Sequence, residues 1–514
     1  MAPPHNTLRF DIASDPTSLD PLFAHQDANA VEQQLARLAF EPFIDIDDRG
    51  RSVPVLLDRI PDRRNGGLSA DGRTIVYRLR HGIRWQDGVA VSSRDVLFTL
   101  RAILDDRNPV RSRAGYDLID RASARDDQTV EIHLRRAWAP AVATFFSNGS
   151  APQFVLPAHL LARLPRLAES AFDSAPIGNG PYRFRSWRRG ERLVYEANAG
   201  YWRGRPRVDR LQIDVIPDPS TNLTLLRTGV LDWNLIAPSQ QAVLRENASL
   251  RYRIVPLALV AGIVMNLRHP PLDAPAIRRA IAESIDRGAI SRKITLGRYP
   301  VIDTAQPRSS WARDPGVAQP AYDPQAADRL FDAAGWRRRP DGMRTKDGRM
   351  LRLTYVQFPE SQTGVRVATL VQSELRARGV DVTIKSISNA QLFLPAARGG
   401  TLASGNFDLA YVPFPMGADP DDAFLLRCDG ASNYMHYCDR DVDRWETQAL
   451  ASTDRDVRRM LYARIERTVA RDVPVLYLFN PSYVYAYDRR LSAFAPNAFS
   501  PTWNAAAWGL ADTR

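Results

Sequence analysis

The sequence contains few cysteines and no long apolar run. Its 514 residues include two cysteines, Cys428 and Cys438, whose spacing fits neither a redox C-x-x-C motif nor a cytosolic metal centre. No apolar stretch reaches the roughly 20 residues that a membrane helix needs, because Pro157 and His159 interrupt the run at 156–161. These absences argue against a membrane-spanning helix, a thiol redox enzyme and a cysteine-based metal site.

Lysine is also scarce, so almost all of the basic charge comes from arginine. The formal net charge of +11 would ordinarily suggest nucleic acid or an acidic membrane as a partner. Lys293, Lys346 and Lys385 are the only lysines among 69 basic residues, and the arginines are spread over the whole chain. The densest cluster, at 337–339, lacks the interleaved aromatic residues of a single-strand-binding surface. We therefore expect no nucleic-acid partner.

Motifs for catalysis and for cofactors are missing as well. Gly178-x-Gly180 lacks the third glycine of a dinucleotide fingerprint, and no Walker lysine follows a glycine-rich turn. The seven histidines include no H-E-x-x-H, and there is no G-x-S-x-G elbow. Aspartates at 439, 441 and 443 resemble the start of a calcium loop, but Arg444 replaces the required glycine, so a solvated helix start is favoured. We expect no enzyme activity, cofactor or metal, although distant carboxylate pairs leave acid–base chemistry open.

Hydrophobic periodicity and turn residues predict a mixed α/β protein. A chain of this length, 44% hydrophobic, usually divides into several lobes, here two or three. Ser92 or Ser93 is a natural helix N-cap. After Asn266 helices and strands alternate, as in an α/β lobe. Strands are expected at 8–12, 74–79, 193–195, 211–215, 351–356 and 380–384, and helices at 28–39, 95–104, 222–227, 276–286, 324–334 and 364–378.

One long segment carries a family signature. The sequence DGRTIVYRLRHGIRWQDG at 71–88, continued by VSSRDVLF at 91–98, closely resembles the signature of family 5 extracellular solute-binding proteins. Further matches run in family order: SLDP at 18–21, the segment 177–184, N-x-x-YW-x-G-x-P at 198–206, TG-x-x-D at 228–232, R-x-AI-x-x-x-IDR at 278–287 and DPD at 419–421. Most of these residues set turns or anchor the core, so we expect them to be scaffold.

The resemblance implies a fold and its division. It implies an α/β, periplasmic binding protein type II-like receptor with three lobes, a hinge and an interlobe cleft that closes around its ligand. The implied segments are 1–48, 173–259 and 482–514 for the discontinuous lobe I, 49–172 for the inserted lobe II, and 260–481 for lobe III.

The resemblance also implies a function. The chain would be the extracytoplasmic receptor of an ABC importer, a monomer that delivers a peptide-like or other medium-sized solute to the membrane permease. Such a protein is exported to the periplasm or the cell surface. Residues 1–10 hold no basic-then-apolar signal peptide, and Met1-Ala2 before two prolines looks like a start codon placed before a mature sequence.

The cysteine pair fits an exported protein. In an oxidising compartment Cys428 and Cys438 would form one small disulfide loop, the alternative being two unrelated buried thiols. Some dipeptide-binding members of the family carry such a pair just after the Asp-Pro-Asp motif. The resemblance therefore implies that the two cysteines are joined.

Two positions that the family uses for ligand charges are apolar here. Peptide receptors of this type hold the ligand's amino terminus with an aspartate three residues before the Asp-Pro motif, where this chain has Met416. Some dipeptide binders hold the carboxyl terminus with an arginine just before a helix, a position that corresponds to Phe358. Apolar side chains cannot compensate a buried ammonium or carboxylate. The resemblance therefore implies a mostly uncharged cleft.

The strand that ends at Met416 is the principal candidate for lining that cleft. We expect Tyr411, Pro413, Phe414 and Met416 to line it, although a simple core strand is the alternative. Two prolines within four residues suit a cleft edge better than a central strand. Further candidate ligand-binding residues, taken from their positions, are His25, Tyr116, Asn389, Phe479 and Asn480.

Other ligands and roles stay open. A non-peptide solute such as an oligosaccharide, an opine or a metal chelate is compatible with the family and with the missing terminal charges. A sensory protein could use the same lobes, but no additional helix-turn-helix domain is visible in the sequence. A peptidase lacks any supporting motif.

Overall fold

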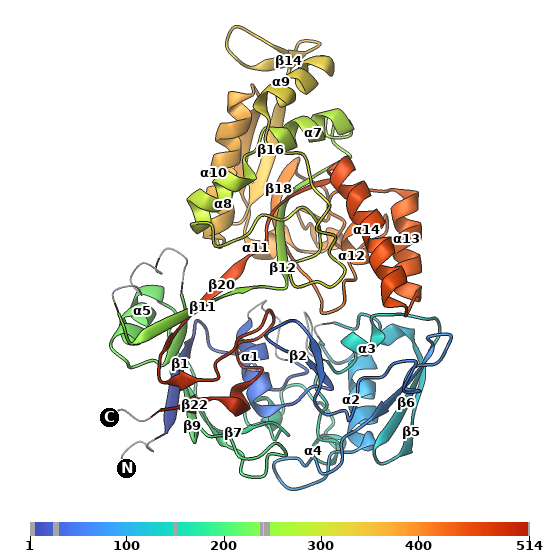
Figure 1. The fold of residues 1–514 in the computed structure, drawn as a ribbon, viewed down its shortest axis with the longest axis vertical. Helices are drawn as coiled ribbons and strands as arrows, with labels where there is room; N and C mark the ends of the chain where they lie inside the picture. The colour runs from blue at the N-terminus through green and yellow to red at the C-terminus, as the bar shows by residue number, and fades with distance from the viewer. Residues whose placement is uncertain are drawn as a thin grey trace. The chain divides into compact units, whose positions relative to one another are not determined.

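A computed structural model describes residues 6–23, 30–110, 112–147, 152–236, 240 and 247–511. The chain divides into two units (Figure 1). The first consists of Met1–Val255, Gly417–Asp419 and Tyr483–Arg514, and the second of Pro256–Met416 and Pro420–Ser482. The three-lobed division expected from the sequence stays a prediction.

A seven-stranded mixed sheet forms the centre of the first unit. Its order is β11 (Leu250–Pro256), β20 (Ser482–Asp488), β10 (Trp233–Ile236), β1 (Thr7–Ile12), β9 (Arg210–Val215), β8 (Arg192–Ala197) and β7 (Tyr182–Arg188). Strand β1 pairs in parallel with both β9 and β10, whereas β7, β8 and β9 form an antiparallel meander. The alternating burial of β1 places Leu8, Phe10 and Ile12 in the core of this unit.

A smaller sheet and several short elements complete the first unit. Helix α2 begins where predicted, because Ser92 and Asp95 form a capping box at its first turn. The remaining elements are α1 (Ala30–Ala39), β2 (Ile44–Ile46), β3 (Ser52–Pro54), β4 (Thr74–Arg78), α2 (Ser93–Leu104), β5 (Ile119–Asp126), β6 (Thr129–Leu134), α3 (Ala141–Thr144), α4 (Ala158–Leu161), α5 (Pro219–Arg227), β21 (Leu491–Ser492) and β22 (Gly509–Leu510).

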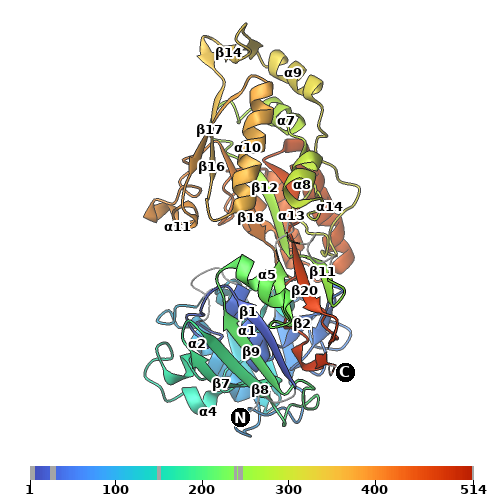
Figure 2. The same cartoon turned by 90° about the vertical axis from the view of Figure 1, so that its left-hand side faces the viewer.

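A five-stranded sheet forms the centre of the second unit (Figure 2). Its order is β17 (Asp381–Ser386), β16 (Arg352–Gln357), β18 (Leu409–Pro415), β12 (Leu259–Met265) and β19 (Val475–Phe479). Strands β17, β16 and β18 are parallel, and β12 is antiparallel to both of its neighbours. Nearly all of β12 and β19 is buried, as expected for strands covered on both faces.

Helices pack around this second sheet, with α10 against β16 and β17. They are α7 (Pro275–Glu283), α8 (Arg287–Thr295), α9 (Pro324–Ala333), α10 (Gln362–Ala377), α11 (Asn389–Leu392), α12 (Ala423–Leu426), α13 (Arg440–Ala451) and α14 (Arg455–Asp472). The short strands β13 (Arg337–Arg338), β14 (Arg344–Lys346) and β15 (Arg349–Met350) form a separate three-stranded sheet.

The helix and strand expectations from the sequence are confirmed, with small shifts at the ends. Helix α5 begins three residues before its predicted start, because Asp218 caps it and Pro219 fits the first helical position. Helix α13 begins directly after Asp439, whose carboxylate accepts from two backbone N–H groups. The aspartate run is therefore a helix start, as the sequence favoured.

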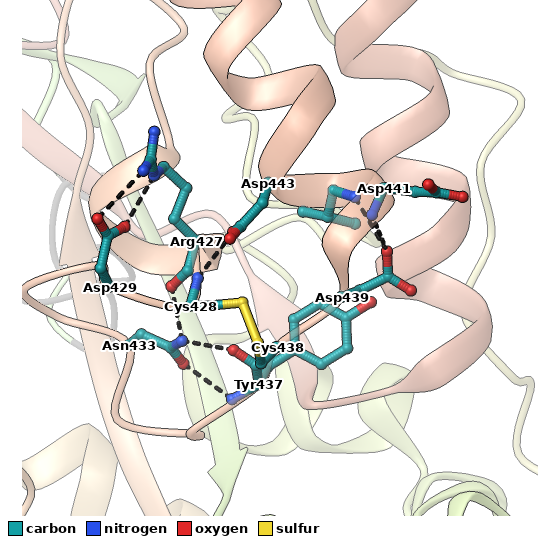
Figure 3. The surroundings of a disulfide bond; sticks show 10 residues. Arg427, Cys428, Asp429, Asn433, Tyr437, Cys438, Asp439, Asp441 and Asp443 are labelled. Carbon is teal, nitrogen blue, oxygen red and sulfur yellow. Dashed lines mark hydrogen bonds and ion pairs between the residues drawn. A yellow bond between two sulfur atoms is a disulfide. The ribbon is translucent and has the colours of Figure 1, made fainter.

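The cysteine pair lies next to that helix start. Cys428 and Cys438 are joined in a disulfide, with their Cα atoms 4.5 Å apart. The Cys428 backbone N–H donates to Asp443, and Arg427 pairs with Asp429 (Figure 3). The disulfide closes the loop between α12 and α13, and the hydrogen bond from Cys428 to Asp443 attaches that loop to the first turn of α13.

No helix in the described part of the chain combines the length and the apolarity that crossing a bilayer requires. The described residues also include no group of three or more metal-ligating side chains that could hold an ion.

Candidate functional site

The strand order of the second unit identifies one edge of its sheet as a candidate for ligand binding. The chain runs through β16, then β17, then β18, but β16 lies between the other two. The crossover direction therefore reverses between β16 and β18. In open α/β sheets, ligands bind outside the carboxyl ends of the strands at such a reversal.

Strand β18 pairs unequally on its two sides. Its pairing with β12 extends from Leu409 to Pro415, whereas its pairing with β16 stops at Ala410. The Met416 N–H donates to Ala258, so the alternate residues Pro413 and Pro415 direct their nitrogens away from β12. The two prolines therefore cost no ladder hydrogen bond. β18 is central over its first residues and an edge strand over its last ones, and its role in lining a cleft stays a prediction.

A row of aromatic rings lies at this edge. Phe358 follows β16, and its ring centroid is 6.3 Å from that of Tyr411 on β18 and 6.0 Å from that of Phe393. The Tyr434 centroid lies 6.3 Å from that of Phe393 and 6.5 Å from that of Phe414. These spacings are typical of interacting rings. We call these five residues the aromatic row.

The start of α10 packs tightly against this row. A Cβ atom on Gly364 would lie 2.8 Å from the Tyr411 ring, so only glycine allows the helix to approach this closely. Ser361 caps the helix by accepting from the Gly364 N–H at 3.0 Å. The sequence SQTG after β16 therefore sets the position of α10 relative to Tyr411.

The two positions expected to lack ligand charges lie at the same edge. Met416 is 1% exposed and Phe358 is 8% exposed. Burial raises the pKa of the Tyr411 hydroxyl, and it also raises the pKa of Tyr434. Phe358, Tyr411 and Met416 thus belong to the hydrophobic core of the second unit.

Asn389 also comes to this edge, after β17. It is exposed, and its backbone N–H donates to Glu360 at 3.2 Å. Glu360 lies two residues beyond Phe358 and is itself exposed. The edge therefore carries one carboxylate that the sequence reasoning missed.

Two predicted residues, Tyr116 and Phe479, occupy other places. Tyr116 is buried in the first unit, where its hydroxyl accepts from the Phe146 N–H at 2.9 Å. Phe479 ends β19 and packs against Tyr299, with ring centroids 5.4 Å apart. His25 lies outside the described residues. A ligand-binding role for any of the three stays a prediction.

Asn480 holds two backbone segments together. Its amide donates to the carbonyl oxygens of Leu257 and Leu259 at 2.8 and 2.7 Å, and its side-chain oxygen accepts from the Arg308 N–H. It therefore clamps together the two segments that lead into β12 and out of β19. Its fully buried amide is occupied by the protein itself.

Phe393 and Tyr434 belong to the aromatic row but were not predicted. Both are half-buried, and both lie in segments between regular elements. Neither position is part of an alternating or helical pattern. The sequence around them gives no clear signal, because Phe393 lies between two leucines and Tyr434 precedes a methionine.

A family model and curated relatives match this chain over most of its length. The family model for bacterial extracellular solute-binding proteins, family 5 Middle, matches residues 57–435. Protein XP55 of Streptomyces lividans is 28% identical over 504 residues, which cover 93% of this chain and 84% of that protein.

Solved structures share the fold. The oligopeptide-binding protein AppA of Bacillus subtilis in complex with a nonapeptide has a TM-score of 0.79 at 20% identity, with 99% of this chain and 100% of that chain covered. NikA of Brucella suis in complex with Fe(III)-EDTA has a TM-score of 0.84 at 21% identity, with coverage of 98% and 100%. The α/β, type II-like binding-protein fold expected from the sequence is therefore confirmed.

Proposed function

This chain belongs to family 5 of the bacterial extracellular solute-binding proteins, and from that premise we propose that it captures a peptide-like or other medium-sized solute for the membrane subunits of an ABC importer. The observation that carries the proposal is the aromatic row at the carboxyl ends of β16 and β18. Phe393 and Tyr434 are the half-buried rings of this row, and their exposed parts provide apolar surface on which the uncharged part of a solute can stack.

Capture requires the protein to close around the solute. The segments that connect the two units indicate where the chain bends. The two long segments that join the units pass at residues 255–256 and 482–483. Asn480 and the bond from the Leu257 N–H to Pro481 tie these segments together within the second unit. We propose that closure bends the chain just outside this clamp, as hinges absorb their dihedral changes at a few residues.

The remaining parts of the proposal follow from the family. The protein is exported, acts as a monomer, binds no nucleic acid and releases its solute chemically unchanged. Related receptors are binding proteins and not enzymes. A disulfide between Cys428 and Cys438 supports an oxidising location.

The selectivity that we propose follows from Met416 and Phe358. A ligand ammonium buried beside Met416 would lack a counter-charge, which costs several kcal/mol. Peptides with blocked termini, longer peptides whose termini reach solvent, and neutral solutes should therefore bind better than free dipeptides. A metal chelate is the second candidate, because its charges are internally compensated and the chain shares its fold with the chelate-bound NikA.

Native mass spectrometry of protein purified without refolding tests the proposal directly. A retained solute would appear as a mass shift, and the same solute should raise the melting temperature of stripped protein because it binds only the folded state. Phe393→Ala and Tyr434→Ala should each weaken its binding by about tenfold, as expected from a lost aromatic contact. Binding that is unchanged in both variants would locate the solute elsewhere, and conversion of the solute would identify an enzyme.

Met416→Asp tests the charge argument. The new carboxylate should not weaken, and should strengthen, binding of ligands with a free amino terminus. Met460→Asp is the matched control, because Met460 is 49% exposed and lies on α14. Submicromolar binding of free dipeptides by the wild-type protein, abolished by blocking their termini, would contradict the selectivity and leave the receptor assignment intact.

A further inference from the structure

The seven-stranded sheet of the first unit ends in an open edge strand. Strand β11 is the last strand in the order of this sheet, and β20 is its one neighbour among the described strands. Its residues 251–254 are all exposed, and they include Tyr252 at 41% and Ile254 at 36%. An exposed edge strand of this kind is a template on which another extended chain can pair.

The hydrogen bonds between β11 and β20 show which backbone groups of β11 are left over. The Arg489 N–H donates to Ser249 at 2.8 Å, and the Leu257 N–H donates to Pro481 at 2.9 Å. Both bonds fit one antiparallel register, so the odd-numbered residues of β11 direct their backbone groups toward β20. The even-numbered residues between them direct their N–H and C=O groups to the open edge. This edge therefore offers both donors and acceptors, unlike the open flank of β18.

The same alternation separates the charged side chains of β11 from the apolar ones. Leu250 packs in a small core beside α5, and Tyr252 and Ile254 point to that face because side chains alternate along a strand. Arg251 and Arg253 point to the opposite face. The open edge thus has an apolar side and a basic side.

The two arginines of β11 have no carboxylate partner. Neither Arg251 nor Arg253 forms an ion pair with a residue that the structure describes. In the register given by the two bonds to β20, the residues opposite them are Tyr487 and Tyr485, whose rings belong to the core of the unit. The neighbouring strand therefore supplies no counter-charge on this side.

The other edge of the same sheet, β7, carries arginines that are paired. Arg185 pairs with Glu196 at 2.9 Å, and Arg188 pairs with Glu191 at 3.3 Å. The uncompensated charge of β11 is thus not shared by these arginines of β7. Like charges directly opposite each other destabilise a strand pair, so the arginines disfavour pairing of β11 with β11 of a second copy and favour an acidic strand.

We propose that β11 binds an extended acidic segment of a partner protein, which joins the sheet as a further strand. The backbone of the segment pairs with Tyr252 and Ile254. Its side chains alternate, so that carboxylates face Arg251 and Arg253 while apolar side chains face Tyr252 and Ile254. The site shares no residue with the aromatic row and is independent of the solute proposed above.

A fluorescent octapeptide of alternating glutamate and valine, with both termini blocked, is the probe for this site. Titration with the full-length protein, followed by fluorescence anisotropy, gives the affinity. A peptide of the same composition with its four glutamates in one run should bind at least tenfold more weakly, because it cannot match the two sides of β11. Equal binding of the two peptides would overturn the proposed recognition.

Two further peptides test whether the backbone pairs. One is N-methylated on its valine amides and the other on its glutamate amides, so each has lost the donors of one of its two edges. Only one edge of an added strand faces β11, so one methylated peptide should lose binding and the other should keep it. Equal effects of the two methylations would contradict strand addition.

Variants of the protein locate the site. Arg251→Gln and Arg253→Gln should each weaken binding of the alternating peptide by up to about fivefold, as expected for an exposed ion pair. Ile254→Pro removes a donor from the open edge without removing a bond to β20, so it should weaken binding about tenfold and keep the melting temperature. Arg440→Gln, at the exposed first residue of α13, is the matched control and should bind like the wild type.

Three results would assign the observations to something else and overturn the proposal. Peptide binding that is lost in Phe393→Ala and kept in the two arginine variants would place the peptide in the proposed solute site. Competition by a single-stranded oligonucleotide that itself requires Arg251 and Arg253 would identify a nucleic-acid surface. A dimer in sedimentation that dissociates in Ile254→Pro would identify a second copy of this chain as the occupant. Absence of peptide binding to the wild type would also overturn the proposal.

Discussion

Two buried polar clusters, one in each unit, solve the problem of internal charge in opposite ways. In the first unit Arg37 is 3% exposed and bonds to Glu41 at 2.9 Å and to Asp45 at 2.6 Å. It also donates to the carbonyl oxygens of Phe40 and Trp503. This cluster places its charges in direct ion pairs.

The second unit buries three acids close together, and two of them have strongly raised pKa values. Asp422 and Glu446 are fully buried, and Glu466 is 3% exposed. Burial, followed by the charge of Asp422, raises the pKa of Glu446 well above its usual range. Burial likewise raises the pKa of Glu466 to about 8. The raised pKa values favour the protonated, neutral forms of Glu446 and Glu466 at neutral pH.

Because the clusters differ in this way, we expect different changes to destabilise each of them. A buried ion pair fails when one partner is removed, because the other is left as an uncompensated charge. A cluster of protonated acids fails when the solution removes its protons. The first cluster is therefore sensitive to mutation and the second to pH.

Arg37→Met should give the largest effect. Glu41 and Asp45 would remain buried without their cation, which typically costs about 3–5 kcal/mol. Chemical denaturation at neutral pH measures this loss in the free energy of unfolding. Arg188→Ala is the control, because its pair with Glu191 is mostly exposed and should contribute under about 1 kcal/mol. Equal losses of stability in the two variants would show that the buried ion pairs of Arg37 contribute no more than an exposed pair does.

Glu466→Gln should change how stability depends on pH. The folded protein holds this proton up to about pH 8, whereas the unfolded chain releases it near 4.5. Stability is therefore highest below the unfolded pKa and falls as pH rises toward 8, by up to about 1.4 kcal/mol per pH unit. The amide keeps an oxygen to accept from the Asp314 N–H, so the variant should lose this slope. Chemical denaturation of the wild type, Glu466→Gln and the exposed control Glu191→Gln between pH 5 and 9 measures this slope. Parallel curves of stability against pH for all three proteins would contradict the prediction.

Opening the disulfide should have a smaller effect. Cys428 and Cys438 are ten residues apart, and closing so short a loop stabilises by about 2–3 kcal/mol in the chain-entropy model. The double variant Cys428→Ser with Cys438→Ser should lose that amount in denaturation at pH 6, where the acids are protonated. Non-reducing peptide mapping of exported wild-type protein is the companion measurement, and two free thiols there would refute the bond.

Arg427→Gln should give the smallest effect. Its charge lowers the pKa of Glu446, but its side chain is 26% exposed and already pairs with the exposed Asp429 (Figure 3). A half-exposed cation of this kind contributes up to about 1 kcal/mol. Asp429→Asn breaks the same pair and keeps the cation, so the difference in alkaline stability between the two variants isolates the action of Arg427 on the acids. A loss above that of the disulfide variant would mean that the second cluster also depends on an ion pair.

Local signals predicted much of the fold because they act between neighbours along the chain. Ser92 caps α2 and forms its capping box with Asp95, three residues later. Helix α14 was not predicted, since arginines occupy much of it and Arg458 is nevertheless buried. Arginine stems can cover apolar surface, which weakens the pattern that a helix leaves in a sequence.

The candidate site was only partly predictable, because some of its residues meet through contacts between distant segments. Phe358 and Met416 came from family spacing, and the structure brings both to the edge where β16 and β18 end. Phe393 and Tyr434 reach Phe358 and Phe414 through loops. Contacts between loops depend on tertiary packing and leave no period in the sequence. The acid cluster was missed similarly, because Asp422, Glu446 and Glu466 come from three separate helices or their caps.

The one-sided pairing of β18 limits how an extended peptide can bind to this strand. Pro413 and Pro415 have no N–H, so the open flank of the strand presents carbonyl oxygens and no donors at these two positions. A peptide laid alongside could not extend the sheet there through a complete ladder, which is how many proteins bind peptides by adding a strand. The flank is thereby guarded against indiscriminate strand addition and aggregation. A solute bound there, as proposed above, would be recognised by side chains and by the two carbonyl oxygens and not by a complete backbone ladder.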